Sequence, residues 1–548
     1  MTQRPHESSD PAAVRGTDAG FVLESWLGTT VRCFAGRPLT LVHALDRAVR
    51  AHPDRIGVEG TDYQVGWGEF AELVEAAAED LRGHGLRPGD VVSAALGNGL
   101  DIVVAIWACA RAGLIFAGLP TRSAPSTWST LLTREQPRLV LTEHSYADDV
   151  RAAASSAGLD PALVKPIGAL LAGRRTAWRG EQIAFPDESS TYAVVYSSGT
   201  TGVPKSVEMV HRCAVHSAMS YLETVGLTGD DRTAITFPLY YVTGHIAQVL
   251  TMMITGGTAL PVSDLSGPDL VDVIIGKQIS YVMVAPSLWT LMLRDSRFRY
   301  PTAKCLVRGA FGGAPVPLST ITTLQERMPQ LRLTDVYGLS ENHSPITMLR
   351  DNEFRRKPGS VGRPLRICDV RVVDDEGADL PCGEVGELLA RGPNITTGYR
   401  NDAVATAAAI TDGWLRTGDY CRIDSEGFVY VLDRKKDVII RGGFKVFSVE
   451  VEYALVSHPL IEAATAFGVP DRLAFEAVAV QVVTKPGADL SAGEVRDWVH
   501  DRVADYAVPR HVRFVESITR NRTGKVDKGA LRAELVAELG ARARPPLR

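Results

Sequence analysis

The ten residues from Tyr196 to Lys205 have the composition of a loop that binds phosphate groups. They read YSSGTTGVPK, in which two glycines and four hydroxyl residues are followed by a lysine. Backbone N–H groups, hydroxyls and a lysine together can surround the oxygens of a polyphosphate. The loop is not a Walker A loop, because Pro204 stands where that pattern needs a glycine before the lysine. The sequence therefore predicts a polyphosphate site of another kind.

Further short motifs with glycine and polar residues follow along the chain. They are Gly312-Gly313-Ala-Pro, Val336-Tyr-Gly-Leu-Ser-Glu341, Gly386-Glu-Leu, Gly413-Trp-Leu-Arg-Thr-Gly-Asp419, Asp433-Arg-Lys-Lys-Asp437, Gly442-Gly443 and Thr523-Gly-Lys525. Gly97-Asn-Gly99 has neither the full GxGxxG spacing nor the acidic residue that a dinucleotide fingerprint needs, so NAD binding is rejected.

These motifs, taken with the loop, resemble in identity and order those of the adenylate-forming superfamily. That superfamily contains acyl-CoA and aryl-CoA synthetases, amino-acid adenylation domains and luciferases, and the motifs here are closest in style to the aryl- and acyl-CoA ligases. The resemblance spans nearly the whole chain. It implies an AMP-forming acid–thiol ligase that joins a carboxylate to the α-phosphorus of ATP, expels pyrophosphate and transfers the acyl group to coenzyme A.

The chemistry of that reaction indicates what the catalytic residues must supply. A carboxylic acid is already ionised at pH 7, so adenylation needs positive charge between two anions rather than a general base. By resemblance, Lys525 supplies that charge and Thr200 of the loop also acts in catalysis. Glu341 is expected to hold Mg²⁺, which favours one or two carboxylates plus phosphate oxygens.

The resemblance also assigns residues that contact ATP. Tyr337 is expected to stack on adenine, Ser340 to contact phosphate, and Asp419 to accept hydrogen bonds from both ribose hydroxyls, with Arg434 supporting the ribose. The remaining nucleotide-binding residues are Ser197, Ser198, Gly199, Thr201, Gly202, Lys205 and Gly313.

Transfer to the second substrate is expected to follow a rotation of a small domain. Lys436 matches the hinge residue of the family, and Gly442 with Gly443 matches the acceptor tunnel, where glycines allow close backbone approach. Three positions depart from the family pattern. Ser448 stands where many members have proline, Ser206 follows the loop lysine in place of glycine, and Glu208 puts a carboxylate near the phosphate loop, from which we expect it to point away.

The acid pocket is predicted around the segment Phe237–His245. No Asp occurs between 233 and 255 to pair with an ammonium group, which makes an α-amino acid substrate unfavourable. Tyr240 or Tyr241 is expected to supply a hydroxyl, and an aryl or arylacrylic acid is favoured. The predicted lining residues are Tyr241, Val242, Thr243, His245, Gly312, Gly338, Asn342 and His343. For the two histidines a purely structural role is the alternative.

Other functions stay open at this point. The acceptor can be the thiol of a separate carrier protein, since the chain ends soon after Lys525 and no carrier domain follows. Some superfamily members activate nitrite and diazotise an aryl amine. A non-catalytic binding relative is the minor alternative, although Lys525, Glu341 and Asp419 are all present.

Composition excludes several other classes. The chain has 548 residues with 45% hydrophobic and 22% charged residues and a net charge of −5, so nothing favours nucleic-acid binding. No stretch is long and apolar enough for a membrane span, and the N-terminus has no signal peptide. Seven scattered cysteines are typical of a reduced, cytoplasmic protein without structural zinc. We expect a monomer or homodimer.

The elements that must position these residues alternate between helix and strand. Helices are predicted at 68–83 and 101–112, with strands at 90–95, 114–117, 137–142, 191–196, 233–237 and 280–284. After about residue 365, short alternating strands at 369–375, 386–392 and 427–433 predict antiparallel structure.

The prediction is thus an α/β fold. Residues 21–432 form a large N-terminal domain of parallel-type sheets with helices and a small β-barrel-like part. Residues 433–436 form the hinge, and 437–548 form a small mobile α+β domain. Residues 1–20 are predicted to be a disordered tail.

Overall fold

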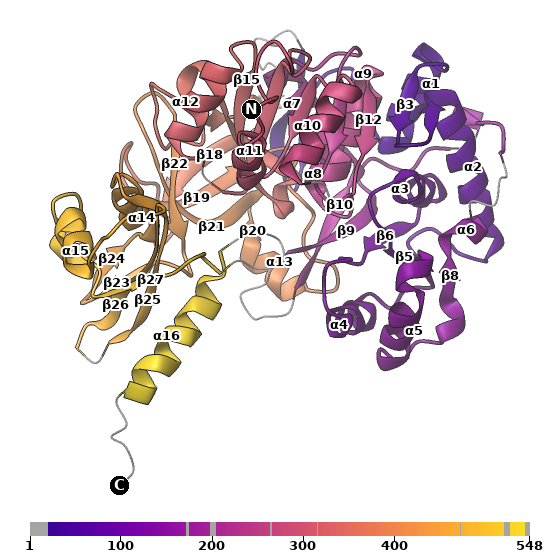
Figure 1. The fold of residues 1–548 in the computed structure, drawn as a ribbon. Helices are drawn as coiled ribbons and strands as arrows, with labels where there is room; N and C mark the ends of the chain where they lie inside the picture. Colours follow the sequence, from indigo (N-terminus) through magenta and orange to yellow (C-terminus); the bar gives the residue numbers. More distant parts are fainter. Residues whose placement is uncertain are drawn as a thin grey trace, which may run out of the picture.

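The computed structural model describes residues 20–170, 175–182, 184–197, 204–263, 266–314, 316–471, 473–519 and 526–542. The predicted tail therefore lies almost wholly outside the described residues. The chain begins with a hairpin of β1 (Phe21–Trp26) and β2 (Thr29–Phe34) and then enters a large α/β domain, drawn from indigo to orange in Figure 1.

One sheet of the large domain leads into the phosphate loop. Its strand order is β10-β9-β6-β5-β7-β8, and all pairs except β9 with β10 are parallel. The strands are β5 (Val91–Ala95), β6 (Ile115–Gly118), β7 (Leu139–Thr142), β8 (Val164–Pro166), β9 (Thr191–Ser197) and β10 (Lys205–Val210). Because β9 and β10 pair antiparallel, both stems of the loop are fixed in the sheet.

A second sheet carries the other predicted nucleotide-binding motifs. Its order is β17-β16-β15-β14-β13-β11-β12-β3-β4, parallel from β15 through to β3 and antiparallel at both edges. The strands are β3 (Ile56–Glu59), β4 (Gln64–Gly66), β11 (Arg232–Ile235), β12 (Thr258–Pro261), β13 (Tyr281–Met283), β14 (Arg308–Gly312), β15 (Arg332–Leu339), β16 (Ser344–Arg350) and β17 (Arg363–Pro364).

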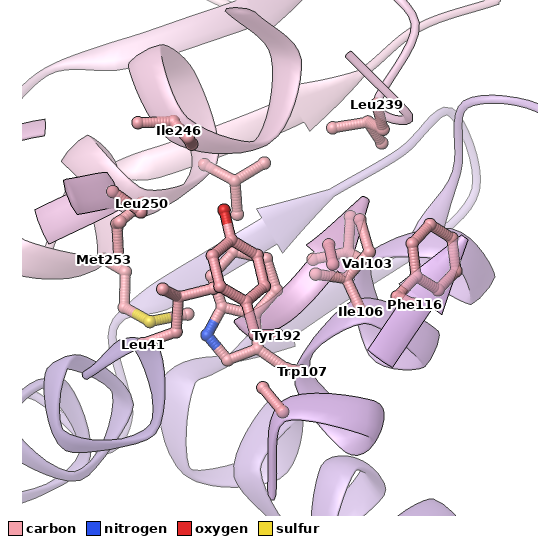
Figure 2. Close-up of a cluster of buried hydrophobic side chains, with 14 of the residues drawn as sticks. Leu41, Val103, Ile106, Trp107, Phe116, Tyr192, Leu239, Ile246, Leu250 and Met253 are labelled. Atoms are coloured by element: carbon pink, nitrogen blue, oxygen red, sulfur yellow. The ribbon is translucent and has the colours of Figure 1, made fainter. Parts of the chain in front are cut away.

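Helices α1 (Leu41–Ala51), α2 (Trp67–Gly83) and α3 (Leu100–Ala112) contribute to the main core of this domain. Apart from Arg111, which pairs with Glu75, helix α3 is apolar from Ile102 to Ala112 and is buried over this range, as expected for a helix enclosed by other elements. Figure 2 shows Trp107 of α3 and Tyr192 of β9 packed with Leu41 of α1 and Met253 of α9 (Thr251–Thr255).

The other helices of the large domain cover the sheets and connect their strands. They are α4 (Pro125–Glu135), α5 (Ala147–Ser156), α6 (Ile167–Leu170), α7 (His211–Tyr221), α8 (Val242–Gly244), α10 (Gly267–Gly276), α11 (Pro286–Met292), α12 (Leu318–Arg327) and α13 (Ala403–Ala409).

A third, antiparallel sheet follows in the chain and corresponds to the predicted β-barrel-like part. Its order is β18-β19-β21-β20, with β22 paired to β21. The strands are β18 (Asp369–Val373), β19 (Gly386–Arg391), β20 (Ile410–Thr411), β21 (Trp414–Ile423) and β22 (Val429–Arg434).

The small domain, yellow-orange in Figure 1, has a sheet and a core of its own. Strands β24-β23-β26-β25 follow in that order, with β27 beside β26. Its elements are β23 (Ile439–Arg441), β24 (Phe444–Val446), α14 (Ser448–Val456), β25 (Ile461–Asp471), β26 (Phe475–Thr484), α15 (Ala492–His500), β27 (His511–Phe514) and α16 (Lys528–Arg542).

The predicted fold class and the predicted positions of helices and strands are confirmed. Strands β22 and β23 belong to different sheets, and the chain crosses between them at 435–438. The exact domain boundary and the hinge stay predictions. No helix among the described residues is long and apolar enough to cross a membrane.

Candidate active site

Asp419 is the centre of a group of three side chains from three strands. It lies in β21, and its carboxylate accepts a hydrogen bond from the Tyr337 hydroxyl of β15 at 2.6 Å. The Arg434 Nε, on the paired strand β22, lies 2.8 Å from the other carboxylate oxygen. The side chain of Asp419 is only 3% exposed, so the arginine compensates a nearly buried charge. The arrangement holds an ionised acceptor in a fixed orientation, as recognition of a vicinal diol requires.

Tyr337 stays a neutral phenol in this environment. Burial and the neighbouring Asp419 carboxylate hold the pKa of Tyr337 well above its usual value. Its ring is partly exposed while its hydroxyl is bonded to Asp419, so a flat ligand can stack on the ring without breaking that hydrogen bond.

Glu341 is connected to Lys205, at the end of the phosphate loop, by Tyr399. The sequence did not single out Tyr399. Glu341 belongs to a short 3₁₀ turn (Ser340–Asn342), and its Oε1 accepts a hydrogen bond from the Tyr399 hydroxyl at 2.9 Å. The ring of Tyr399 in turn lies 4.6 Å from the Nζ of Lys205. Tyr399 therefore connects the loop lysine to the candidate magnesium ligand. Its sequence signal was weak, since Tyr399 sits in a loop after Gly398 with no flanking motif.

The surroundings of Glu341 suit a magnesium ion that arrives with a nucleotide. Among the described residues, Glu341 Oε2 accepts no hydrogen bond, and no group of three or more His, Cys, Asp and Glu side chains gathers to hold a metal. A single carboxylate agrees with the preference of Mg²⁺ for a few protein ligands completed by phosphate oxygens and water.

Only the two ends of the phosphate loop can be described. Ser197 ends β9 and Lys205 begins β10, and the two residues face each other in the ladder. The predicted loop residues Ser198, Gly199, Thr200, Thr201 and Gly202 lie outside the described residues, as does Lys525. Their assigned roles stay predictions.

Close packing of the backbone requires glycine at several of the predicted site positions in the second sheet. A Cβ at Gly338 would lie 1.5 Å from the Ser344 carbonyl oxygen, and one at Gly312 would lie 2.5 Å from the Val336 carbonyl oxygen. Gly313 has a φ of +80°, a conformation that favours glycine. Only glycine lets the ends of β14, β15 and β16 approach this closely.

Three residues predicted to line the acid pocket make hydrogen bonds to the protein itself. His245 donates from Nδ1 to backbone carbonyls and accepts from the Tyr192 hydroxyl at 2.9 Å. His343 Nε2 accepts from the Val210 N–H at 2.9 Å. The Asn342 amide bonds the Leu339 N–H and the Ser344 carbonyl.

Burial explains why these side chains face inward. Desolvation lowers the pKa of His245 to about 4 and that of His343 to about 3, so both rings are neutral at pH 7. These hydrogen bonds agree with the structural alternative, and contact of the two histidines and Asn342 with the acid stays a prediction.

Tyr241 is a residue of this region whose hydroxyl stays available among the described residues. It precedes the short helix α8, and its ring lies 4.8 Å from that of Tyr240 at an angle of 61°. Tyr240 packs against β6, where a Cβ at Gly118 would lie 2.3 Å from the tyrosine Cβ. Tyr241 is partly exposed and its hydroxyl makes no hydrogen bond among the described residues. Burial raises the pKa of Tyr241 to about 12, so the group is a neutral donor.

The other predicted pocket residues of this segment lie on α8 beside Tyr241. Val242 is buried at 8% exposure and Thr243 is partly exposed. They are positioned next to the tyrosine pair, as the prediction requires, although their contact with an acid is not tested by the structure.

Glu208 points away from the loop lysine, as expected. Side chains alternate along β10, so Glu208 projects from the face opposite to Lys205. Its Oε2 accepts a hydrogen bond from the Thr397 hydroxyl at 2.7 Å.

The glycine pair predicted for the acceptor tunnel forms a tight turn. Gly442 and Gly443 connect β23 to β24 with φ values of 59° and 90°, and a Cβ on either would meet nothing within 4 Å. Positive φ at both positions is typical of a type I′ hairpin. Lys445, just after the turn, donates to Asp375 at 2.9 Å and to the Tyr420 hydroxyl at 3.0 Å, which joins the small domain to the large one.

Ser448 has a backbone role that proline cannot fill. Its N–H donates to Asp433 Oδ2 at 2.7 Å in a buried position. We expect Ser448→Pro to lower the free energy of unfolding by ~1–2 kcal/mol, because proline has no N–H and leaves the carboxylate short of a partner. Urea unfolding measures the change, with Ser448→Ala as the control that keeps the N–H. Equal stability of the proline and alanine variants would contradict this assignment.

The α/β domain, the small domain beside it and the group around Asp419 agree with a two-domain nucleotide-binding enzyme, and comparison with known proteins shows the family. The family model of AMP-binding enzymes matches residues 45–400, and that of their C-terminal domain matches residues 450–525. The chain belongs to the AMP-binding family of adenylate-forming enzymes.

Its relatives include several acid–CoA ligases. A feruloyl-CoA synthase of Amycolatopsis is 29% identical over 89% of this chain and 97% of its own length. An indoleacetate–CoA ligase of Aromatoleum aromaticum is 29% identical over 90% of this chain and 97% of its own length. The structure of o-succinylbenzoate CoA synthetase from Bacillus subtilis, solved with its acyl-adenylate intermediate, has a TM-score of 0.79 at 28% identity, over 90% of this chain and 97% of that one. The same enzyme has also been solved with ATP and a magnesium ion.

Proposed function

We propose that this protein adenylates an aryl or arylacrylic acid with MgATP and transfers the acyl group to coenzyme A. The observation that carries the proposal is the group formed by Asp419, Tyr337 and Arg434, with Glu341 and Lys205 joined through Tyr399. The first three suit a ribose and a stacked base, and the others suit a magnesium polyphosphate.

Each residue has a defined task in this proposal. Lys205 and the loop hydroxyls hold the polyphosphate, while magnesium on Glu341 would neutralise its charge. To Lys525 we assign the positive charge that stabilises the crowded phosphorane as one carboxylate oxygen bonds to phosphorus and pyrophosphate leaves. The thiolate of coenzyme A then attacks the acyl carbon and AMP leaves.

An aromatic acid is supported by the tyrosine pair and by the relatives. The partly exposed ring of Tyr241 packs against Tyr240, and its hydroxyl makes no hydrogen bond among the described residues, which together suit a flat acid with a polar substituent. The names of the relatives specify feruloyl, indoleacetate and succinylbenzoate groups, each of which contains a ring.

The test is product formation across a panel of acids. Aryl, arylacrylic and fatty acids, with nitrite included, are incubated with MgATP, with and without coenzyme A, and products are identified by mass spectrometry. We expect an acyl-CoA and AMP from an aromatic acid, with no thioester when coenzyme A is left out. AMP release without any CoA thioester would mean that the acceptor is not coenzyme A and would favour a carrier-protein thiol. Turnover with nitrite as the only acid would favour diazotisation as the reaction.

The hinge can be tested separately. The Lys436 side chain is exposed, and among the described residues its N–H makes no hydrogen bond, so a proline there removes no backbone hydrogen bond of this conformation. We expect Lys436→Pro to keep pyrophosphate release and to slow thioester formation at least tenfold, because the ring fixes φ and restricts rotation. Single-turnover kinetics of both steps measure this, with Lys436→Ala as the control. Equal loss of both steps would mean that the hinge lies elsewhere.

A further inference from the structure

A buried carboxylate, that of Glu135, contacts a residue at the end of the phosphate loop. Placing a carboxylate at this position costs free energy. Glu135 is the last residue of α4 and is 3% exposed. The C-terminal end of a helix carries partial negative charge, and burial disfavours an ionised group, so both effects oppose a carboxylate here. Burial raises the pKa of Glu135 accordingly. Stability of α4 does not explain this residue, so its reason must lie in what it contacts.

Glu135 binds the residue that follows the loop lysine. Its Oε1 accepts a hydrogen bond from the hydroxyl of Ser206, which is fully buried, and its Oε2 lies 3.5 Å from Arg400 Nε. The carbonyl of Ser206 accepts from the Arg400 N–H at 2.8 Å. Ser206 also faces Tyr196 in the ladder between β9 and β10. The serine that stands in place of glycine at position 206 therefore has a buried hydrogen-bond acceptor, the Glu135 carboxylate.

The neighbouring residue of the helix holds the loop end as well. Arg134 donates to the Pro204 carbonyl at 3.1 Å, and its other terminal nitrogen lies 3.7 Å from Asp402. Lys205, between the two anchored residues, projects to the opposite face of β10, where its Nζ lies over the Tyr399 ring. Arg134 and Glu135, two consecutive residues of α4, therefore hydrogen-bond to Pro204 and Ser206, the two neighbours of Lys205.

This group is not arranged for stability alone. Among the described residues, four of its buried polar atoms have no hydrogen-bond partner, namely Arg134 Nε, Glu135 Oε2, Tyr196 Oη and Arg400 Nε. A partly satisfied buried network costs free energy that an apolar cluster would not. Its position at both stems of the loop indicates that its role is tied to the loop.

We propose that Glu135 and Ser206 are positioning residues that hold the exit of the phosphate loop so that Lys205 is directed at the polyphosphate of ATP. The inference rests on the proposed function, because it takes the loop to bind ATP. Loss of the bond between the hydroxyl and the carboxylate frees the first residues of β10, and Lys205 then loses its direction. Affinity for ATP falls, while affinity for the acid, which the network does not touch, is unchanged.

The test measures MgATP binding to the full chain by isothermal titration calorimetry, without any acid. We expect Ser206→Ala to weaken binding about tenfold, as loss of one hydrogen bond to a charged group predicts. Glu135→Gln, which keeps its shape, is expected to weaken binding by a similar factor. The double variant should be no weaker than the stronger single variant, because the two residues act through one bond. Thr133→Ala removes a hydroxyl from the exposed face of the same helix and should bind like the wild type.

Kinetics and stability separate a positioning role from a merely structural one. In steady state the KM for ATP should rise in both variants while the KM for the acid stays within twofold. Ser206→Ala with wild-type ATP affinity, or with an effect that simply adds to that of Glu135→Gln, would overturn the inference, even if its melting temperature fell. A wild-type chain that binds no MgATP would instead overturn the proposed function itself, and that outcome is visible before any variant is made.

Discussion

Lys525→Ala will lower the rate of pyrophosphate release by ~10²–10³ while ATP still binds. Adenylation brings an acid carboxylate against the α-phosphate, and the phosphorane between them concentrates negative charge. A single cation that meets that charge acts mainly in the transition state, so its loss should lower kcat far more than it raises the Kd for ATP.

The measurement is pyrophosphate release in a single turnover, with ATP affinity measured by calorimetry on the same variant. Lys528→Ala is a matched control, since Lys528 lies three residues on and bonds Ser448 and Glu452 of the small domain. Near-normal pyrophosphate release by Lys525→Ala would exclude the role that the motif assigns to this lysine.

Asp419→Asn will lower kcat/KM for ATP more than a hundredfold, or about 3 kcal/mol. Asparagine keeps the shape of the side chain but removes the charge that Arg434 compensates at 2.8 Å. Arg434 is then left with an unpaired charge beside a nearly buried amide. A ribose also loses an ionised acceptor, so the loss should appear in ATP binding and leave the KM for the acid unchanged.

Tyr337→Phe is the control for that variant. It removes the hydroxyl that donates to Asp419 at 2.6 Å and keeps the ring available for stacking. We expect a loss of about tenfold or less, as for a single hydrogen bond to a charged group. A similar loss in both variants would mean that Asp419 acts by holding Tyr337 rather than by binding the nucleotide.

The grouping of Tyr337 with Asp419 could be predicted from the sequence because each residue lies in a short contiguous motif, while their contact with a nucleotide stays a prediction. Tyr337 and Asp419 are 82 residues apart in the chain, yet each is marked by its own glycine-containing motif, and the structure brings their side chains together. The positions of the parallel strands could also be predicted locally, because buried parallel strands are continuous apolar runs in the sequence.

The acid side is harder to predict from the sequence, because burial decides which side chains can face a ligand. His245 and His343 look like ligand-binding residues in a sequence, but whether a histidine faces a pocket or a backbone carbonyl depends on packing between distant elements. Tyr399 and Glu135 were missed because neither stands in a motif. Their importance comes from contacts with Glu341 and Ser206, each more than 50 residues away.

The most direct test of the central claim follows one oxygen atom. An accepted acid labelled with ¹⁸O in its carboxylate is incubated with the enzyme, MgATP and coenzyme A, and the AMP formed is analysed by mass spectrometry. Adenylation joins a carboxylate oxygen to the α-phosphorus, and attack by the thiol breaks the bond to the acyl carbon, so one ¹⁸O atom should leave in each AMP. Unlabelled AMP, or ¹⁸O in inorganic phosphate together with ADP, would contradict an acyl-adenylate intermediate.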